Sequence, residues 1–278
     1  MINKLLQNSK IKILNSKQIL IFTLENRNCL EFDSLIFGFL LSFLYNLPMH
    51  LSDSDTQRLK DLVTVFLAEN AKVNLSALRT EEQCFIGNVL DSLSFIDLLP
   101  SIVAADSPAK PLRILDIGTG GGFPLLPLAM LLPQHEFVGL DAVLKKVDAV
   151  DRIIKTLHIP NAKVVSARVE EFAHRDSMRG TFDIVTFRAV APISTLLEYG
   201  IPLLKTRGKC VLWKSMHIAD ELRLSLNATK ELHASLTHTF PYTLPGDWGE
   251  RQLLVYEKNA GTPSSYPRKN GLPKNKPL

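Results

Sequence analysis

Four glycines lie within five positions of the stretch Arg113–Pro124, which reads RILDIGTGGGFP. Glycine is costly to order, so such a cluster indicates a backbone that turns sharply or approaches a bound group closely. The stretch contains Asp116 at the end of an apolar run, and a second acid, Asp141, ends the next predicted strand 23 residues after Gly118. Amide N–H groups at a helix start favour an anionic group, and an acid at the second position can accept hydrogen bonds from ribose hydroxyls. The pattern predicts a nucleotide-like ligand.

Spacing separates this loop from two other nucleotide motifs. A dinucleotide fingerprint G-x-G-x-x-G would need glycine where Phe123 stands, and no lysine of a Walker A loop lies between Arg113 and Lys145. The D-x-G-x-G-x-G pattern that precedes a predicted helix resembles instead the S-adenosylmethionine site of class I methyltransferases. That resemblance implies that Asp116 lies near the methionyl ammonium and Asp141 at the ribose. The alternative is a tight turn without a ligand. The loop residues that we expect at the cofactor are Gly118, Thr119, Gly120, Gly122 and Phe123.

Strands and helices alternate from residue 112 onward. The predicted strands are Leu112–Asp116, Glu136–Asp141, Ala162–Ser166, Phe182–Phe187 and Lys209–Trp213. This alternation favours an α/β fold with a mostly parallel sheet and helices on both faces, the Rossmann-like class I methyltransferase architecture. Two later segments, Leu232–Tyr242 and Gln252–Glu257, are expected to add an antiparallel hairpin at one edge.

The chain is expected to divide into four parts: an N-terminal extension at 1–48, a helical segment at 49–108, the methyltransferase domain at 109–258 and a basic flexible tail at 259–278. The helical segment has an apolar stripe with caps at Ser52–Ser54 and a second helix opening at Thr80, and a proline-rich linker follows at Pro100–Pro111. Within the extension, the apolar run Leu35–Leu47 is shorter than the roughly 20 residues of a membrane span. It is an extra helix, an interfacial helix or translated upstream sequence, and we take 49–278 as the functional unit.

Composition places the protein in a broad class. A net charge of +4 and a pI near 8.9 are slightly basic without indicating a nucleic-acid binder. The three cysteines form no C-x-x-C pair, which argues against a disulfide framework and a zinc site and is typical of a reducing cytosol. We expect a monomeric cytoplasmic protein without a metal ion or a membrane anchor.

Sequence features restrict the chemistry that such a methyltransferase could perform. The loop after the fourth predicted strand, TFRAVAP (Thr186–Pro192), lacks the Asn/Asp-Pro-Pro-aromatic pattern of many exocyclic-amine methylases. Cys84 and Cys210 fall inside a predicted helix and a predicted strand, so neither is placed as a nucleophile for cytosine C5. A ring nitrogen, an oxygen or a protein amine remains as the acceptor. Arg188, at the carboxyl end of that strand, can clamp a carboxylate or phosphate, or it forms a surface salt bridge.

Several motifs resemble one family in order and spacing, over about residues 51–278. They are NLSALRTEEQ…NVLDSLSF (Asn74–Phe95), DIGTGGGFPLLPLA (Asp116–Ala129), ARVEEF (Ala167–Phe172), FRAVAP (Phe187–Pro192), WKS (Trp213–Ser215) and YPRKNGLPKNKPL (Tyr266–Leu278). The family is the glucose-inhibited division protein B family, the small-subunit ribosomal RNA guanine-N7 methyltransferases. The resemblance implies S-adenosylmethionine-dependent N7-methylation of one guanine of 16S rRNA, guanine 527 in RNA numbering, with the rRNA or the small ribosomal subunit as partner.

Carried over by position, the resemblance implies cofactor contacts at Gly118, Phe123, Val169, Glu170 and Arg188. The family usually has histidine where Asn88 stands. This departure puts an acid–base role at that position in doubt and favours a structural or RNA-hydrogen-bonding role.

Transfer to guanine N7 needs no nucleophilic residue, so positioning is the expected contribution of the enzyme, with Arg188, Asn88 and Lys214 as candidates. Lys214 is expected to follow the fifth strand and Arg251 to open the last one, both facing RNA together with Arg268 and Lys269 of the tail. Two other functions stay open: a methyltransferase for a small molecule or a protein, and a non-catalytic module that binds the cofactor or RNA.

Overall fold

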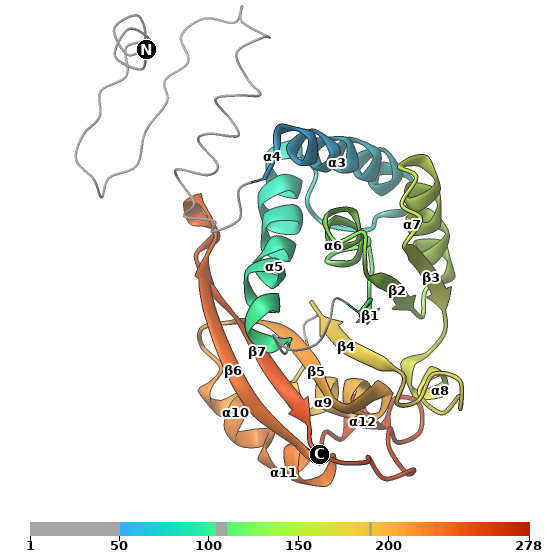
Figure 1. Cartoon of the computed structure of the whole chain (residues 1–278), viewed down its shortest axis with the longest axis vertical. Helices are drawn as coiled ribbons and strands as arrows, with labels where there is room; N and C mark the ends of the chain where they lie inside the picture. Colours follow the sequence, from blue (N-terminus) through green and yellow to red (C-terminus); the bar gives the residue numbers. More distant parts are fainter. Residues whose placement is uncertain (1–50, 104–109, 189–190) are drawn as a thin grey trace, which may run out of the picture.

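The computed structural model describes residues 51–103, 110–188 and 191–278, and in them a seven-stranded sheet has the order β3-β2-β1-β4-β5-β7-β6 (Figure 1). The strands are β1 (Arg113–Ile117), β2 (Glu136–Asp141), β3 (Ala162–Ser166), β4 (Phe182–Phe187), β5 (Leu204–Ser215), β6 (Ala234–Thr243) and β7 (Glu250–Lys258). The first five are parallel, and β7 runs antiparallel to both β5 and β6. The predicted class I fold is confirmed. The expected extension at 1–48, with Leu35–Leu47, lies outside the described residues.

Strand β5 differs most from the sequence-based prediction. It runs from Leu204 to Ser215 instead of from Lys209 to Trp213. Its second half pairs with β4 on one side and, from Lys209 to Ser215, with β7 on the other, which extends it beyond the buried apolar run. Its first half is mostly exposed and joins β4 only at Phe182, across a register shift. Hydrophobic patterning therefore detects only the central part of this strand.

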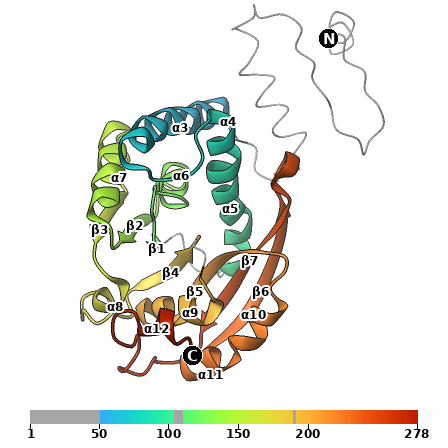
Figure 2. The ribbon, with the colours of Figure 1, turned by 180° about the vertical axis from the view of Figure 1, so that it is seen from behind.

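Helices cover both faces of the sheet (Figures 1 and 2). One face carries α3 (Asp53–Val73), α4 (Glu81–Cys84), the π-helix η1 (Phe85–Leu90), α5 (Asp91–Ile102), α6 (Leu125–Leu131) and α7 (Leu144–Thr156). The opposite face carries α8 (Val169–Phe172), α9 (Ile193–Gly200), η2 (Ile201–Leu203), α10 (Ala219–Leu224), α11 (Leu226–Glu231) and α12 (Leu272–Asn275), while η3 (Gly246–Trp248) lies in the β6–β7 turn. Parallel strands joined by helices require such cover because both faces of the sheet are apolar.

The predicted helix starts carry the expected caps. The Ser52 hydroxyl accepts a hydrogen bond from the Asp55 N–H at 3.0 Å, and the Thr80 hydroxyl accepts one from the Gln83 N–H at 3.2 Å. Each bond satisfies one of the backbone donors that a helix start leaves unpaired. The second helix then continues through Pro100 to Ile102, so the predicted linker begins later than its first proline suggests.

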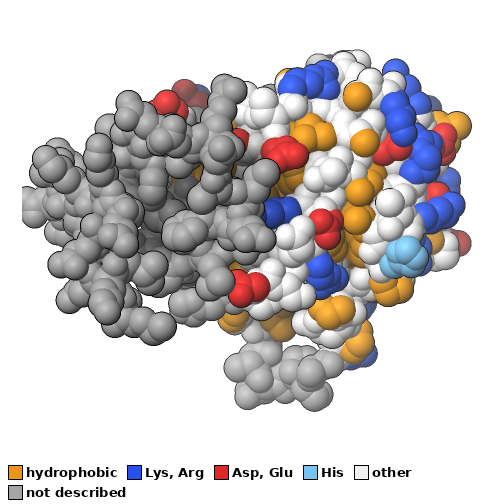
Figure 3. Space-filling view, turned by 90° about the horizontal axis from the view of Figure 1, so that it is seen from above, with side chains coloured by type: hydrophobic (Ala, Val, Ile, Leu, Met, Phe, Trp, Pro, Cys, Tyr) orange, Lys and Arg blue, Asp and Glu red, His pale blue; other side chains and the backbone are white. Residues whose placement is uncertain are grey.

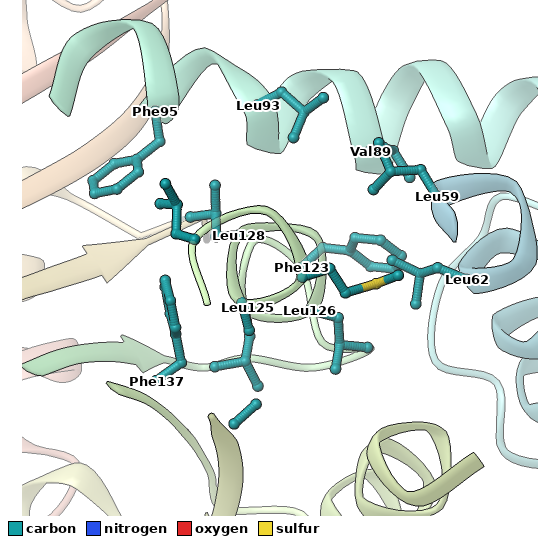
Figure 4. Close-up of a cluster of buried hydrophobic side chains, with 14 of the residues drawn as sticks. Leu59, Leu62, Val89, Leu93, Phe95, Phe123, Leu125, Leu126, Leu128 and Phe137 are labelled. Carbon is teal, nitrogen blue, oxygen red and sulfur yellow. The ribbon is translucent and has the colours of Figure 1, made fainter. Parts of the chain in front are cut away.

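The run Glu81–Ile102 is the one helical stretch, among the described residues, that is long and apolar enough to cross a membrane by length and composition. It is mostly buried inside the protein, so it is a core helix. Figure 4 shows its Val89, Leu93 and Phe95 packed with Leu59 and Leu62 of α3 around α6. The N-terminal helices therefore share one core with the sheet, where truncating a fully buried leucine to alanine costs about 2–5 kcal/mol.

Candidate active site

The glycine loop between β1 and α6 has free space beside its first glycine and tight packing around its last one. Gly118 has a φ of +73°, and a Cβ built on it would meet no atom within 4 Å. Gly122 has a φ of +87°, and a Cβ there would lie 2.5 Å from Cδ1 of Leu126. Both positions favour glycine by conformation, but only the second requires it for packing. The backbone at Gly118 thus faces space that a bound group can occupy.

Asp116 lies at the foot of this loop, 2% exposed. Its Oδ1 accepts a hydrogen bond from the Thr186 hydroxyl at 2.9 Å, whereas its Oδ2 has no partner in the described part of the chain. Burial raises the pKa of Asp116 to about 6. The hydroxyl oxygen of the neighbouring Thr119 is buried and makes no hydrogen bond of normal geometry to the described residues, although it lies close enough to the Asp116 carboxyl to lower the pKa of that group. Buried polar atoms without partners are rare in folded proteins, so these atoms are candidates to meet a polar group of a ligand.

Asp141, at the end of β2, holds the loop in shape. Its Oδ2 accepts the Gly120 N–H and its Oδ1 accepts the Val143 N–H, both at 2.9 Å. Each carboxylate oxygen can accept a further hydrogen bond, so these contacts leave room for ribose hydroxyls.

Arg188 follows β4 and reaches across to η1. Its Nη1 donates to the Gly87 carbonyl at 2.9 Å and to Oδ2 of Asp91 at 3.2 Å, and its Nη2 donates to Oδ1 of Asn88 at 2.6 Å. Its guanidinium carbon lies 5.7 Å from the centre of the Phe123 ring. Burial lowers the pKa of Arg188, and the Asp91 charge opposes that shift. These bonds leave the Nε N–H and one Nη2 N–H for a ligand.

Asn88 and Asp91 are the η1 and α5 partners of that arginine, and both are buried. Because Oδ1 of Asn88 accepts from Arg188, its Nδ2 points elsewhere, and this amide nitrogen has no partner in the described residues. Asp91 also accepts the Tyr242 hydroxyl at 2.6 Å and lies 3.4 Å from Nη1 of Arg251. Sequence reasoning missed Asp91 and Tyr242, although the LDS triplet that contains Asp91 belongs to the quoted motifs.

Phe123 is less available to a ligand than its place in the loop implies. Its ring is 5% exposed and packs edge-to-face on Phe66, with 5.0 Å between ring centres. Its side chain therefore joins the loop to α3. Contact with a bound group would involve its backbone or the edge of its ring.

The start of α8 carries the other two residues that we expected to contact the cofactor. Val169 is its first residue and is half-buried. Glu170 is 2% exposed, and its Oε1 accepts from Arg168 at 3.0 Å and from the Gly271 N–H at 2.9 Å. Burial alone would raise the pKa of Glu170, but these hydrogen bonds bring it below its usual value. Oε2 of Glu170 is buried without a partner among the described residues.

Comparisons with known proteins agree with this geometry. The family model described as rRNA small subunit methyltransferase G matches residues 55–243. Ribosomal RNA small subunit methyltransferase G of Carboxydothermus hydrogenoformans is 32% identical over 239 residues, covering 86% of this chain and 98% of that protein. The protein of the same name from Desulfitobacterium hafniense is 34% identical over 232 residues, covering 84% and 93%.

The chain belongs to the rRNA small subunit methyltransferase G family. It is thus an rRNA methyltransferase, and the resemblance stated from its motifs is confirmed. Two solved structures share its fold. A Bacillus cereus O-methyltransferase in complex with SAH has a TM-score of 0.55 at 17% identity, covering 81% of this chain and 98% of its own. A putative O-methyltransferase from Klebsiella pneumoniae has a TM-score of 0.51 at 16% identity, covering 82% and 97%.

Three of the four cations that we expected to face RNA in this rRNA methyltransferase have acidic partners. Lys214 lies inside β5, not after it, and its ammonium donates to the Ala191 carbonyl at 2.7 Å and to Glu221 at 2.6 Å. Arg251, the second residue of β7, contacts buried Asp91. Arg268 pairs with Glu198, which is fully buried. Lys269 is exposed and has no ion pair in the described part of the chain.

A second group of cations lies on the opposite side of the molecule from the tail. Figure 3, viewed from above Figure 1, shows lysine and arginine side chains along one side of the described surface. On α3 and α7, at the top of Figure 1, Lys72 and Arg152 both pair with Glu69, and Lys155 pairs with Asp151. These contacts offset part of the positive charge of that face.

Neither cysteine among the described residues has the properties of a nucleophile. Cys84 and Cys210 are both fully buried. Burial raises the pKa of the Cys84 thiol to about 11 and moves that of Cys210 in the same direction. A nucleophilic cysteine needs a lowered pKa and access. No group of three or more His, Cys, Asp or Glu side chains that could hold a metal ion occurs among the residues described.

Proposed function

We propose that this protein transfers the methyl group of S-adenosylmethionine to N7 of guanine 527 of 16S rRNA, acting as a cytoplasmic monomer. The observation that carries the proposal is Asp116. Its buried Oδ2 has no partner, and the loop that follows it has open space at Gly118. A carboxylate of this kind suits a cationic ammonium group, which would satisfy the unpaired oxygen and offset the cost of its burial.

The other residues of the site fit the remaining parts of this cofactor. Asp141 keeps acceptor capacity for the ribose hydroxyls beyond its bonds to Gly120 and Val143. The first turn of α8, with Val169 and Glu170, lies after β3 and would frame the adenine. When bound, S-adenosylmethionine supplies a methyl group on a positively charged sulfur.

The chain needs no general base for this reaction because guanine N7 carries a free lone pair and no proton. Its contribution is to hold the base in line and to exclude other orientations. The unpaired Nδ2 of Asn88 is a donor suited to guanine O6, the acceptor beside N7. Adenine presents an amino group there, so a donor at this place favours guanine. This role also accommodates the histidine that the family usually has at that position.

Arg188 would act behind Asn88 and not on N7 itself. A cation pressed on N7 would oppose the positive charge that develops on the guanine. The bonds of Arg188 to Gly87, Asn88 and Asp91 hold the guanidinium against η1. Its remaining N–H groups are suited to the cofactor carboxylate or to a phosphate. Asp116 or Glu170 offsets the charge that moves onto the base.

Fewer cations are available to bind RNA than the sequence indicates. Lys269 is exposed without an ion pair, whereas Lys214 and Arg268 are engaged with acids of the protein itself. Arg251 is one-third exposed and keeps donors beyond its contact with Asp91. A loop of rRNA, whose bases can leave the stack, fits such a site better than a regular duplex.

The test is transfer of labelled methyl from S-adenosylmethionine to small ribosomal subunits that lack the modification. Naked 16S rRNA and fully modified subunits serve as parallel substrates, and cleavage at 7-methylguanine maps the product. We expect one modified guanine, with undermodified substrate only, and none with the Asp116→Asn variant. Transfer to another nucleotide would refute the target, and cofactor binding without transfer to any RNA would refute the proposed function.

A further inference from the structure

The segment at 259–278, expected to be a flexible basic arm, lies against α8 and α9 instead. Figure 1 shows the C-terminal end beside these helices, with α12 next to α9. The Arg179 side chain donates to the carbonyls of Thr262, Pro263 and Tyr266 at 3.1, 2.9 and 2.7 Å. A single guanidinium thus holds the backbone of three residues of the segment, which is not expected of a solvated arm.

The strongest contact of this segment is the ion pair of Arg268 with Glu198 of α9. The guanidinium donates from Nε to Oε1 at 2.8 Å and from Nη2 to Oε2 at 2.6 Å, and the Arg268 backbone N–H adds a third bond at 2.8 Å. The Glu198 side chain is fully buried. A buried carboxylate that loses its partner is strongly destabilising, so α9 depends on this arginine.

The segment also contacts α8, the helix that carries Val169 and Glu170, two of the residues expected at the cofactor. The Gly271 N–H donates to Oε1 of Glu170 at 2.9 Å, and Glu170 belongs to the first turn of α8. The Thr195 hydroxyl of α9 donates to the Pro273 carbonyl at 2.9 Å. One short stretch of chain therefore joins α8, which follows β3, to α9, which follows β4.

We infer that the C-terminal segment completes the cofactor site: Arg268 anchors the segment to Glu198 of α9, and the Gly271 N–H then holds the first turn of α8 through Glu170. This inference rests on the proposed function. The two elements it joins follow the strands whose carboxyl ends flank the ligand in sheets of this class. Cofactor binding and docking of the segment are then linked, and each favours the other by the same factor.

Titration of the full-length protein with S-adenosylhomocysteine tests the inference without any RNA. We expect Arg268→Ala to raise the Kd tenfold or more and Arg268→Lys to recover part of the loss, because lysine keeps the charge but not the bidentate geometry. Lys274→Ala is the matched control, since Lys274 is an exposed cation of the same segment. In methyl transfer, Arg268→Ala should raise the KM for S-adenosylmethionine and leave kcat at saturating cofactor and the KM for RNA unchanged.

A second measurement on the wild-type protein covers the case in which Arg268→Ala does not fold. Trypsin cleaves the segment after Lys269 and Lys274 when it undocks, and saturating S-adenosylhomocysteine should slow this cleavage tenfold or more. An unchanged Kd in a folded Arg268→Ala variant, or no protection in the wild type, would overturn the inference. A wild-type protein that binds no S-adenosylhomocysteine at all would instead refute the proposed function.

Discussion

Replacing Asp116 with asparagine should make the free protein more stable while it weakens cofactor binding. Burial raises the pKa of Asp116 from 3.8 to about 6, and one pKa unit corresponds to about 1.4 kcal/mol. Ionising this carboxylate in the folded, free protein at pH 7 therefore costs about 3 kcal/mol. Because the folded-state pKa lies above the unfolded one, the favourable contribution of the protonated group is present below about pH 4 and is lost as the pH rises through about 6.

The same carboxylate sets the pH dependence of binding. Only its ionised form attracts the ammonium group of the cofactor, so the protein must lose a proton from Asp116 before or during binding. The Kd of S-adenosylhomocysteine should then rise about tenfold per pH unit below about 6 and stay flat above it. The Asp116→Asn variant should bind weakly with a flat profile over the same range.

Calorimetric titrations from pH 5 to 8 at constant ionic strength measure these profiles, and denaturant unfolding at pH 7.5 measures the free energy of unfolding of both proteins. We expect the asparagine variant to be more stable by up to about 3 kcal/mol in the absence of ligand. A wild-type Kd that does not change between pH 5 and 7, or a variant that keeps the wild-type slope, would refute the reasoning.

Three further predictions follow from the site. Gly118→Ala should fold with a loss of about 1 kcal/mol and bind S-adenosylhomocysteine poorly, whereas Gly122→Ala, which adds a clash with Leu126, should lose more in denaturant unfolding; equal unfolding free energies would contradict this. Arg188→Ala should lower methyl transfer at least tenfold and destabilise the fold by about 1–3 kcal/mol, because buried Asp91 loses its closest cation but keeps Arg251 and Tyr242; unchanged kinetics would remove Arg188 from the site. Cys210→Ser should retain kcat for methyl transfer, because the thiol is fully buried and is not a nucleophile; loss of transfer in a folded variant would refute a mechanism without cysteine.

The central strands of the sheet were predictable because each is a short run of apolar residues that can be recognised without knowing its neighbours in space. Strands β2, β3 and β4 begin and end at the residues expected from the apolar runs. The edge hairpin was also visible as two later strand-like segments. The order of these two strands in the sheet was not predictable. The pairing of β7 with both β5 and β6 depends on contacts between distant residues that no local pattern encodes.

The charged residues of the site were predictable in type but not in partner. Lys214 and Arg268 look like free cations in the sequence because their acids, Glu221 and Glu198, become neighbours only when the chain folds. The same holds for Asp91, whose partners Arg188 after β4, Tyr242 on β6 and Arg251 on β7 lie about 100 to 160 positions away. Motif spacing indicated Asp116 and Asp141 because both lie at the carboxyl ends of consecutive strands, where the structure places them beside the glycine loop.

The position of β7 between β5 and β6 determines when the sheet can form during translation. Strand β6 leaves the ribosome before β7, yet β7 is the strand that pairs with it. Until β7 emerges, β6 has no partner and the edge of β5 stays open, an exposed state that favours wrong association with other chains. The sheet of this rRNA methyltransferase can thus close only after all of β7 has emerged.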